Sequence, residues 1–108
     1  MEKTQKRVKI AAGINEINFP KNKIAKIKIA DKIICIAQFN DKLKAFSSAY
    51  PHAGGDLSTG CFDKNENIIC PVHGYRFSTL TGRDTNGEGY FLKIYKIEQT
   101  EEGIFIWL

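Results

Sequence analysis

The chain has 108 residues, of which 43% are hydrophobic and 26% are charged. A chain of this size forms one compact domain with its own hydrophobic core, and the composition indicates neither a disordered segment nor a membrane protein. The net charge of +4 comes largely from lysines in the first third, which mostly alternate with apolar residues. Strands with one solvated face produce that alternation. We therefore expect neither nucleic acid nor a membrane as a partner. An acidic protein partner suits the basic face better.

The sequence also indicates a reducing compartment. No run approaches the roughly 18 apolar residues that a spanning helix needs. The charged N-terminal stretch is not followed by the apolar core of a secretory signal. The three cysteines, Cys35, Cys61 and Cys70, are an odd number, which favours reduced thiols or metal ligands over a disulfide framework. We therefore expect a cytoplasmic protein.

Most of the chain carries the period-two pattern of β-strands, punctuated by glycine, proline and asparagine. The only helical turn we predict lies within residues 14–19, and Cys35 is predicted to be a buried core residue. The predicted architecture is a single all-β domain over residues 1–108, a sandwich or barrel, with a subdomain inserted at approximately 47–80. The predicted strands are Val8 to Ile10, Ile24 to Ile29, Ile33 to Phe39, Leu43 to Phe46, Tyr90 to Ile97 and Gly103 to Leu108.

The candidate metal ligands are concentrated in residues 50–77, which hold both histidines and two of the three cysteines. His52 lies in one glycine-rich loop. Cys70 and His73 lie in a second loop of sequence Cys-Pro-Val-His, where the following Gly74 permits a tight chain reversal. A lone histidine or cysteine is usually structural, but this pairing of two loops predicts a metal site.

These residues resemble the Rieske iron–sulfur proteins, and specifically the small soluble Rieske-type ferredoxins. The family motif is Cys-x-His, a connecting segment and Cys-x-x-His. Here His52 is followed by residues 53–69 and then by Cys70-Pro-Val-His73. The resemblance extends from about Ile33 to the end of the chain, and more weakly over the N-terminal strands. At the place of the first motif cysteine stands Tyr50.

The resemblance implies a sandwich of three antiparallel sheets with a 2Fe-2S cluster at the tip of the inserted two-loop subdomain. His52 and His73 would bind the outer iron and Cys70 the inner iron. Backbone amides of the Gly54 and Gly74 turns would donate hydrogen bonds to the cluster or the cysteine sulfurs. The implied function is that of a one-electron carrier between a reductase and an oxygenase-like acceptor, with no catalytic residues and no complete catalytic activity of its own.

Tyr50 leaves four alternatives open. Two ferric ions, two sulfides and two thiolates form a neutral core, whereas a neutral tyrosine in place of one thiolate leaves a positive charge that is costly in an apolar site. The cluster binds with Tyr50 or water as the fourth ligand, or His52, Cys70 and His73 bind a single iron or zinc ion. Otherwise Cys61 supplies the missing thiolate, or the domain binds no metal and acts as an interaction module.

A second departure lies in the loop that family members usually place over the cluster. That loop usually contains proline, whereas residues 86–90 read Asn-Gly-Glu-Gly-Tyr. The family's shielding of the cluster is therefore not expected here, and an exposed cluster would be less stable, which favours the alternative without a cluster.

Overall fold

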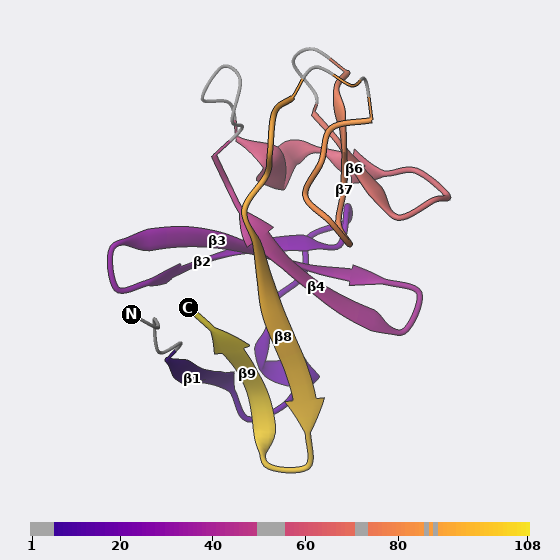
Figure 1. Cartoon of the computed structure of the whole chain (residues 1–108). Coiled ribbons are helices and arrows are strands. Elements are labelled where there is room, and N and C mark those ends of the chain that lie inside the picture. Colours follow the sequence, from indigo (N-terminus) through magenta and orange to yellow (C-terminus); the bar gives the residue numbers. More distant parts are fainter. Residues whose placement is uncertain (1–5, 50–55, 71–73, 86, 88) are drawn as a thin grey trace, which may run out of the picture.

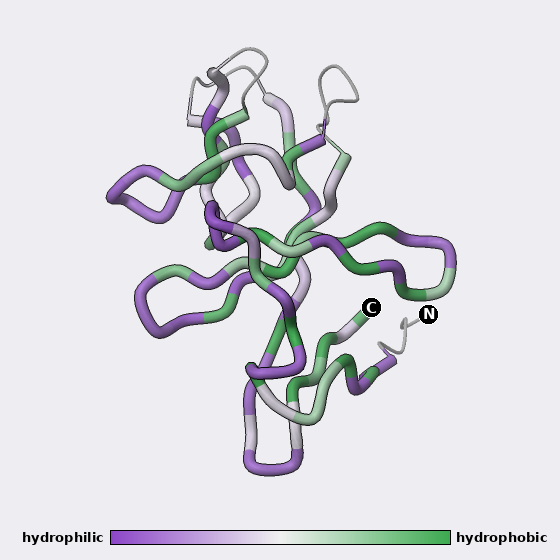
Figure 2. The backbone as a smooth tube through the Cα atoms, turned by 180° about the vertical axis from the view of Figure 1, so that it is seen from behind, coloured by the Kyte–Doolittle hydropathy of each residue, from purple (hydrophilic) through white to green (hydrophobic). Residues whose placement is uncertain are grey.

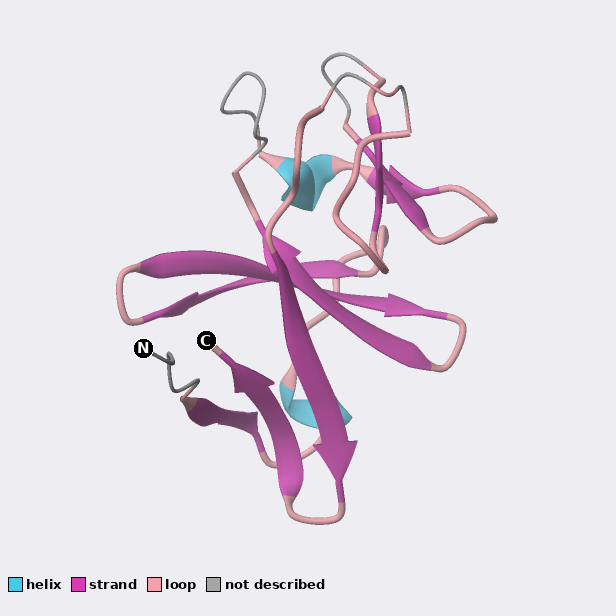
Figure 3. Cartoon of the chain, in the orientation of Figure 1, coloured by secondary structure: helices cyan, strands magenta, loops and turns pink. Residues whose placement is uncertain are grey.

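The computed structural model describes residues 6–49, 56–70, 74–85, 87 and 89–108, and within them nearly all regular structure is strand (Figures 1 and 3). This confirms the predicted all-β class. No helix in these ranges is long and apolar enough to cross a membrane. The elements in chain order are β1 (Arg7–Ala11), η1 (Ile14–Glu16), β2 (Ile24–Ile29), β3 (Lys32–Phe39), β4 (Lys42–Ser47), η2 (Leu57–Thr59), β5 (Cys61–Phe62), β6 (Asn67–Ile69), β7 (Arg76–Ser78), β8 (Ile94–Thr100) and β9 (Gly103–Trp107).

The strands form a six-stranded sheet of order β1-β9-β8-β4-β3-β2 and a three-stranded sheet of order β5-β6-β7, with every pair antiparallel. Strands β4 and β8 share only the residue pairs Ala45–Tyr95 and Phe46–Ile94. The large sheet therefore consists of two three-stranded halves joined at a narrow junction. Together with the small sheet at one end of the molecule, they give the three antiparallel sheets that the resemblance implied (Figure 1).

Strands β1, β2, β3, β4 and β9 lie where the alternation predicts them. In β2, Ile27 and Ile29 are partly buried whereas Lys26 and Lys28 are exposed, so one face packs and the other is solvated. Figure 2 shows the matching pattern along the chain, with hydrophilic segments at the hairpin tips. The predicted helical turn is η1.

The predicted strand from Tyr90 was wrong over its first residues, because β8 begins only at Ile94. The reason is the backbone bonding of residues 90–93. The Leu92 amide donates to the Gly82 carbonyl at 2.7 Å, and Phe91 forms an isolated bridge with Arg83. Residues 90–92 therefore pack on the preceding loop, and bonding to the large sheet begins at Lys93, whose carbonyl accepts from the Ser47 amide at 2.9 Å.

Two apolar clusters stabilise the fold. One fills the space within the six-stranded sheet and is centred on Ile34, Ile36 and Ile106. The other lies between the two sheets, and its buried members are Ile24, Cys35, Ala37, Phe46, Leu57, Ile68, Cys70, Phe77 and Leu92. We call this second set the inter-sheet cluster. Cys35 is fully buried in it, as predicted, and burial raises the pKa of its thiol to about 12.

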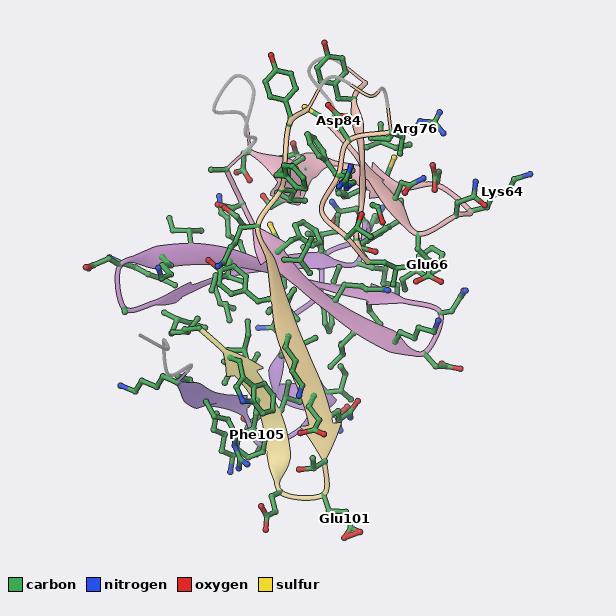
Figure 4. The ribbon with its side chains drawn as sticks, in the orientation of Figure 1. Lys64, Glu66, Arg76, Asp84, Glu101 and Phe105 are labelled. Atoms are coloured by element: carbon green, nitrogen blue, oxygen red, sulfur yellow. The ribbon has the colours of Figure 1, made fainter. Side chains whose placement is uncertain are left out.

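An ion-pair group ties the small sheet to β4 from the side. Lys44 Nζ lies 2.6 Å from Glu66 Oε1, and Lys42 Nζ lies 3.4 Å from Glu66 Oε2. The Lys44 side chain is only 10% exposed, so its charge has a partner where water is scarce. The hydrogen bond from Lys44 holds the pKa of Glu66 below its usual value. Glu66 lies in the β5–β6 turn, which this group fixes to the large sheet (Figure 4).

We expect the Glu66 ion pairs to make stability pH-dependent. A carboxyl whose pKa is lowered by folding contributes stability above its unfolded pKa, and that stability is lost as the pH falls through the lowered, folded-state value. Urea unfolding across this acidic range should therefore show a shallower pH dependence for Glu66→Gln than for the wild type. Glu101→Gln, in the exposed β8–β9 turn, is the control and should leave the profile unchanged. Superimposable profiles for Glu66→Gln and wild type would contradict this role.

The burial of the cysteines predicts their order of reaction. Cys61 is exposed, whereas Cys35 is buried and its pKa is raised to about 12, so little thiolate forms there near neutral pH. Brief iodoacetamide treatment of the folded protein at pH 8, followed by peptide mass spectrometry, should modify Cys61 and leave Cys35 intact. In urea both should react. Equal modification of the two in folded protein would show that the inter-sheet cluster is not packed in solution.

Candidate metal centre

The structure describes two of the six site residues that the sequence predicts. Cys70 and Gly74 are described, whereas Tyr50, His52, Gly54 and His73 lie outside the described residues. What the structure defines is the framework from which the two ligand loops emerge. Strands β6 and β7, which flank the second loop, lie at the end of the molecule that carries the small sheet (Figure 1).

The second loop emerges from the β6–β7 hairpin. Cys70 directly follows β6, and its amide donates to the Tyr75 carbonyl at 2.7 Å. The Gly74 amide donates to the Cys70 carbonyl at 2.8 Å. Gly74 has φ +72°, a left-handed conformation that glycine adopts without steric cost. The two hydrogen bonds close the base of the turn and fix the backbone of Cys70. This residue is buried, with 1% of its surface exposed.

The structure assigns the amide of Gly74 itself to the turn, because it donates to the Cys70 carbonyl. Its contribution is therefore to close the turn that positions Cys70. The hydrogen bonds that the resemblance implies from other amides of the Gly54 and Gly74 turns stay a prediction.

The first loop emerges from a closed base. Ala49 and Asp56 form an antiparallel bridge, and the Leu57 amide donates to the Ser48 carbonyl at 2.8 Å. Residues 50–55 lie between these two anchors. Leu57 is fully buried in the inter-sheet cluster, so the exit from the loop is fixed to the core.

Asp56 stabilises this base through both carboxylate oxygens. Its Oδ1 accepts from the Ser58 amide at 2.9 Å and caps η2, and its Oδ2 lies 2.7 Å from Lys26 Nζ on β2. Burial acts to raise the pKa of Asp56, but the hydrogen bonds from Lys26 and Ser58 outweigh it and lower the pKa. The hydrogen bond to Asp56 in turn raises the pKa of Lys26. Both groups therefore stay charged at neutral pH.

A third loop, residues 84–90, is held by Asp84, which the sequence analysis missed. Asp84 is 8% exposed, and its carboxylate accepts hydrogen bonds from the Gly87 amide at 3.0 Å and the Tyr90 amide at 3.3 Å. The Asp84 amide also donates to the Tyr90 carbonyl at 3.2 Å. This internal acceptor organises a loop that contains no proline. The sequence does contain a signal for this turn, because an aspartate followed three residues later by a glycine is a common turn pattern.

Tyr75 and Tyr90 connect the second and third loops. Their ring centroids lie 6.3 Å apart with an interplanar angle of 28°, a stacked arrangement. Both rings also pack against the inter-sheet cluster that contains Cys70. The stacked pair therefore covers part of the apolar surroundings of the candidate ligand.

Cys61 lies on the wrong face of the small sheet to replace the missing thiolate. It pairs with Ile69 across β5 and β6, and directly opposite residues share a face. Cys70 is the next residue after Ile69, and it is buried whereas Cys61 is exposed. The side chains of Cys61 and Cys70 therefore point to opposite sides of the sheet.

The predicted ligand set fits a Rieske cluster only with an anionic fourth ligand. Cys70 sits among apolar side chains, so the extra positive charge left by a neutral Tyr50 would be poorly solvated. A tyrosine phenolate would restore a neutral core, and the remaining donors have the expected chemistry. Across the described ranges, no three His, Cys, Asp or Glu side chains are grouped to hold a metal ion, and Cys70 is the one predicted ligand described there.

Comparison with known proteins identifies the fold. A family model described as the Rieske [2Fe-2S] domain matches residues 9–90. The ferredoxin of carbazole 1,9a-dioxygenase from Nocardioides aromaticivorans has a TM-score of 0.77 and 20% identity, covering 93% of this chain and 95% of that one. A putative NADH-dependent nitrite reductase small subunit from Mycobacterium tuberculosis has a TM-score of 0.82 and 15% identity, covering 98% and 97%.

A third similar structure is the complex of reduced oxygenase and oxidised ferredoxin in carbazole 1,9a-dioxygenase. The matching chain has a TM-score of 0.72 and 21% identity, with 92% of this chain and 99% of that chain covered. At these identities the structural likeness shows a shared fold. No match was found among curated proteins.

Asp84 provides a test of the third loop. Asp84→Ala should lower the free energy of unfolding by about 1–3 kcal/mol, because partly buried amides lose their acceptor. Amide hydrogen exchange at Gly87 and Tyr90 should accelerate in the same variant. Asp41→Ala, in the exposed β3–β4 turn, is the control and should change neither quantity. Unchanged exchange at Gly87 in Asp84→Ala would refute the proposed organisation of the loop.

Proposed function

Because the chain belongs to the Rieske [2Fe-2S] domain family, we propose that it is an electron-transfer component that carries one electron at a time between a reductase and an oxygenase-like acceptor. The observation that carries this proposal is the Cys70–Tyr75 turn. It holds a buried cysteine at the end of a β-hairpin, and the resemblance assigns this cysteine to the second cysteine of the family motif. The fold shared with an oxygenase-system ferredoxin supports the same class of partner.

The chain's own residues have separate parts in this function. His52 and His73 would hold the outer iron, and Cys70 with Tyr50 as phenolate would hold the inner iron. When bound, the cluster would supply a one-electron redox couple. The closed turn at Gly74 fixes the position of the Cys70 sulfur donor, and the apolar inter-sheet cluster excludes water from it.

The proposed domain organisation follows the same arrangement. We take residues 1–108 as a single domain with a cluster-binding subdomain at approximately 47–80. Helix η2 and strands β5 to β7 all fall within that range and pack on the large sheet through the inter-sheet cluster. Redox partners would reach the tip where the two loops emerge, and a cytoplasmic location suits the three unpaired cysteines.

Tyr50 supports a second candidate function, a binding module without the 2Fe-2S cluster. A neutral tyrosine cannot supply the negative charge that the inner iron needs. Its ring can instead fill the volume that a cluster would occupy, and its hydroxyl can form a hydrogen bond. In that case the loops carry either no metal or a single iron or zinc ion at His52, Cys70 and His73. The domain would then contact its partner through the same tip without redox chemistry.

Cofactor content distinguishes the two functions. After anaerobic reconstitution, the carrier function requires two iron and two acid-labile sulfide per chain, with an electron paramagnetic resonance signal on reduction. Zinc or iron without sulfide would indicate the single-ion site. A colourless protein without a signal would exclude the carrier and leave the binding module.

Substitution of Tyr50 tests its role directly. Tyr50→Cys should greatly increase retention of a red-brown 2Fe-2S chromophore, because a second thiolate neutralises the core. The matched variant Tyr50→Phe, which keeps the ring but removes the oxygen, should lose any cluster that the wild type holds. Absorbance spectra and iron-to-sulfide ratios measure both effects. Failure of Tyr50→Cys to take up a cluster would refute the placement of Tyr50 at the ligand position.

A further inference from the structure

The six-stranded sheet ends in two edge strands that face the same cleft. Strands β1 and β2 are the outermost members of the sheet order. A cleft of ≈ 370 Å³ lies between them. Its lining includes residues of both edges, namely Val8, Lys9, Ile10, Ile27, Lys28 and Ile29. The sheet therefore curls toward closure but leaves its first and last strands unpaired with each other.

The cleft has an apolar floor. Val8, Ile10, Ile27 and Ile29 are partly buried and pack against the buried cluster inside the six-stranded sheet. Lys9 and Lys28 are exposed and alternate with them along the two strands. An extended peptide presents the same alternation, with one side chain in two directed to each face.

The charge of the two edges is uniformly positive. Between them β1 and β2 carry Arg7, Lys9, Lys26 and Lys28, and neither strand contains an acidic residue. Lys26 is paired with Asp56, and Arg7 lies over the Phe105 ring at 3.9 Å. The stem of Lys9 crosses Gly103, whose missing side chain makes room for it. Lys28 is therefore the edge lysine best placed to meet an incoming strand.

The positive charge of the two edge strands determines which kind of chain the cleft can bind. An edge strand offers backbone donors and acceptors to any extended chain, and lysines along it repel a second positively charged edge. A second copy of this protein would bring the same lysines to the cleft, whereas alternating acidic and apolar residues would pair with the lysines and fill the floor. We propose that the β1–β2 cleft binds an extended acidic segment of a partner protein by strand addition. This surface is separate from the metal centre and independent of the proposed redox function.

Binding can be measured by amide chemical-shift mapping of the whole chain with a blocked six-residue peptide of alternating valine and glutamate. Shift changes should concentrate in β1 and β2 and weaken as salt is raised. Lys28→Glu should weaken binding about fivefold, since it replaces an attraction by a repulsion at a solvent-exposed site. Lys64→Glu, in the exposed β5–β6 turn on the far side of the molecule (Figure 4), makes the same charge change and should leave binding unaffected.

Several outcomes would overturn the proposal. They include no shift changes in β1 and β2 at millimolar peptide, and equal effects of Lys28→Glu and Lys64→Glu. Equal binding of a valine–lysine peptide would show that charge does not select the occupant. Shifts that depend on protein concentration alone would assign the cleft to a second copy. Shifts produced by DNA or anionic vesicles but not by the acidic peptide would assign it to another polyanion.

Discussion

The inter-sheet cluster is the contact on which the candidate metal centre depends. Strands β5, β6 and β7 have two or three residues each, and a sheet of such strands has too little buried area to be stable alone. It persists because Ile68, Cys70 and Phe77 from the small sheet pack with Phe46 and other residues of the large one. The cysteine that would bind iron is thus also a member of the core. Conditions that loosen this core would therefore disturb the position of the ligand.

Two ionic contacts reinforce that packing from different sides. Lys44 and Glu66 hold the β5–β6 turn against β4, and Lys26 and Asp56 hold the exit of the first loop against β2. The two contacts differ in solvent access. The Lys44 side chain is 10% exposed and the Lys26 side chain 44% exposed, so the Lys44 pair is screened less by water and salt. Together the two ion pairs fix the orientation of the small sheet relative to the large sheet.

The sequence predicted the large sheet better than the site, for identifiable reasons. Runs such as Ile24 to Ile29 are long enough to show period two, and their ends carry turn residues. Strands of two or three residues show no period, so β5 to β7 appeared only as a two-loop segment. The start of β8 was predicted too early, because the alternating pattern of the strand begins already at residue 90. In the structure the Leu92 amide instead donates to the Gly82 carbonyl of the preceding loop. Glu66 acts through ion pairs with Lys42 and Lys44 on another strand, which no local pattern in the chain specifies. Asp84 was missed although its spacing to Gly87 is a local turn pattern.

The start of β1 and the end of β9 lie side by side. The Leu108 amide donates to the Lys6 carbonyl at 2.9 Å, so β1 and β9 remain paired to their outer limits. Both lie in the half of the molecule away from the small sheet and its loops (Figure 1). A segment joined to either strand would extend from this half, while the small sheet keeps its packing against the inter-sheet cluster.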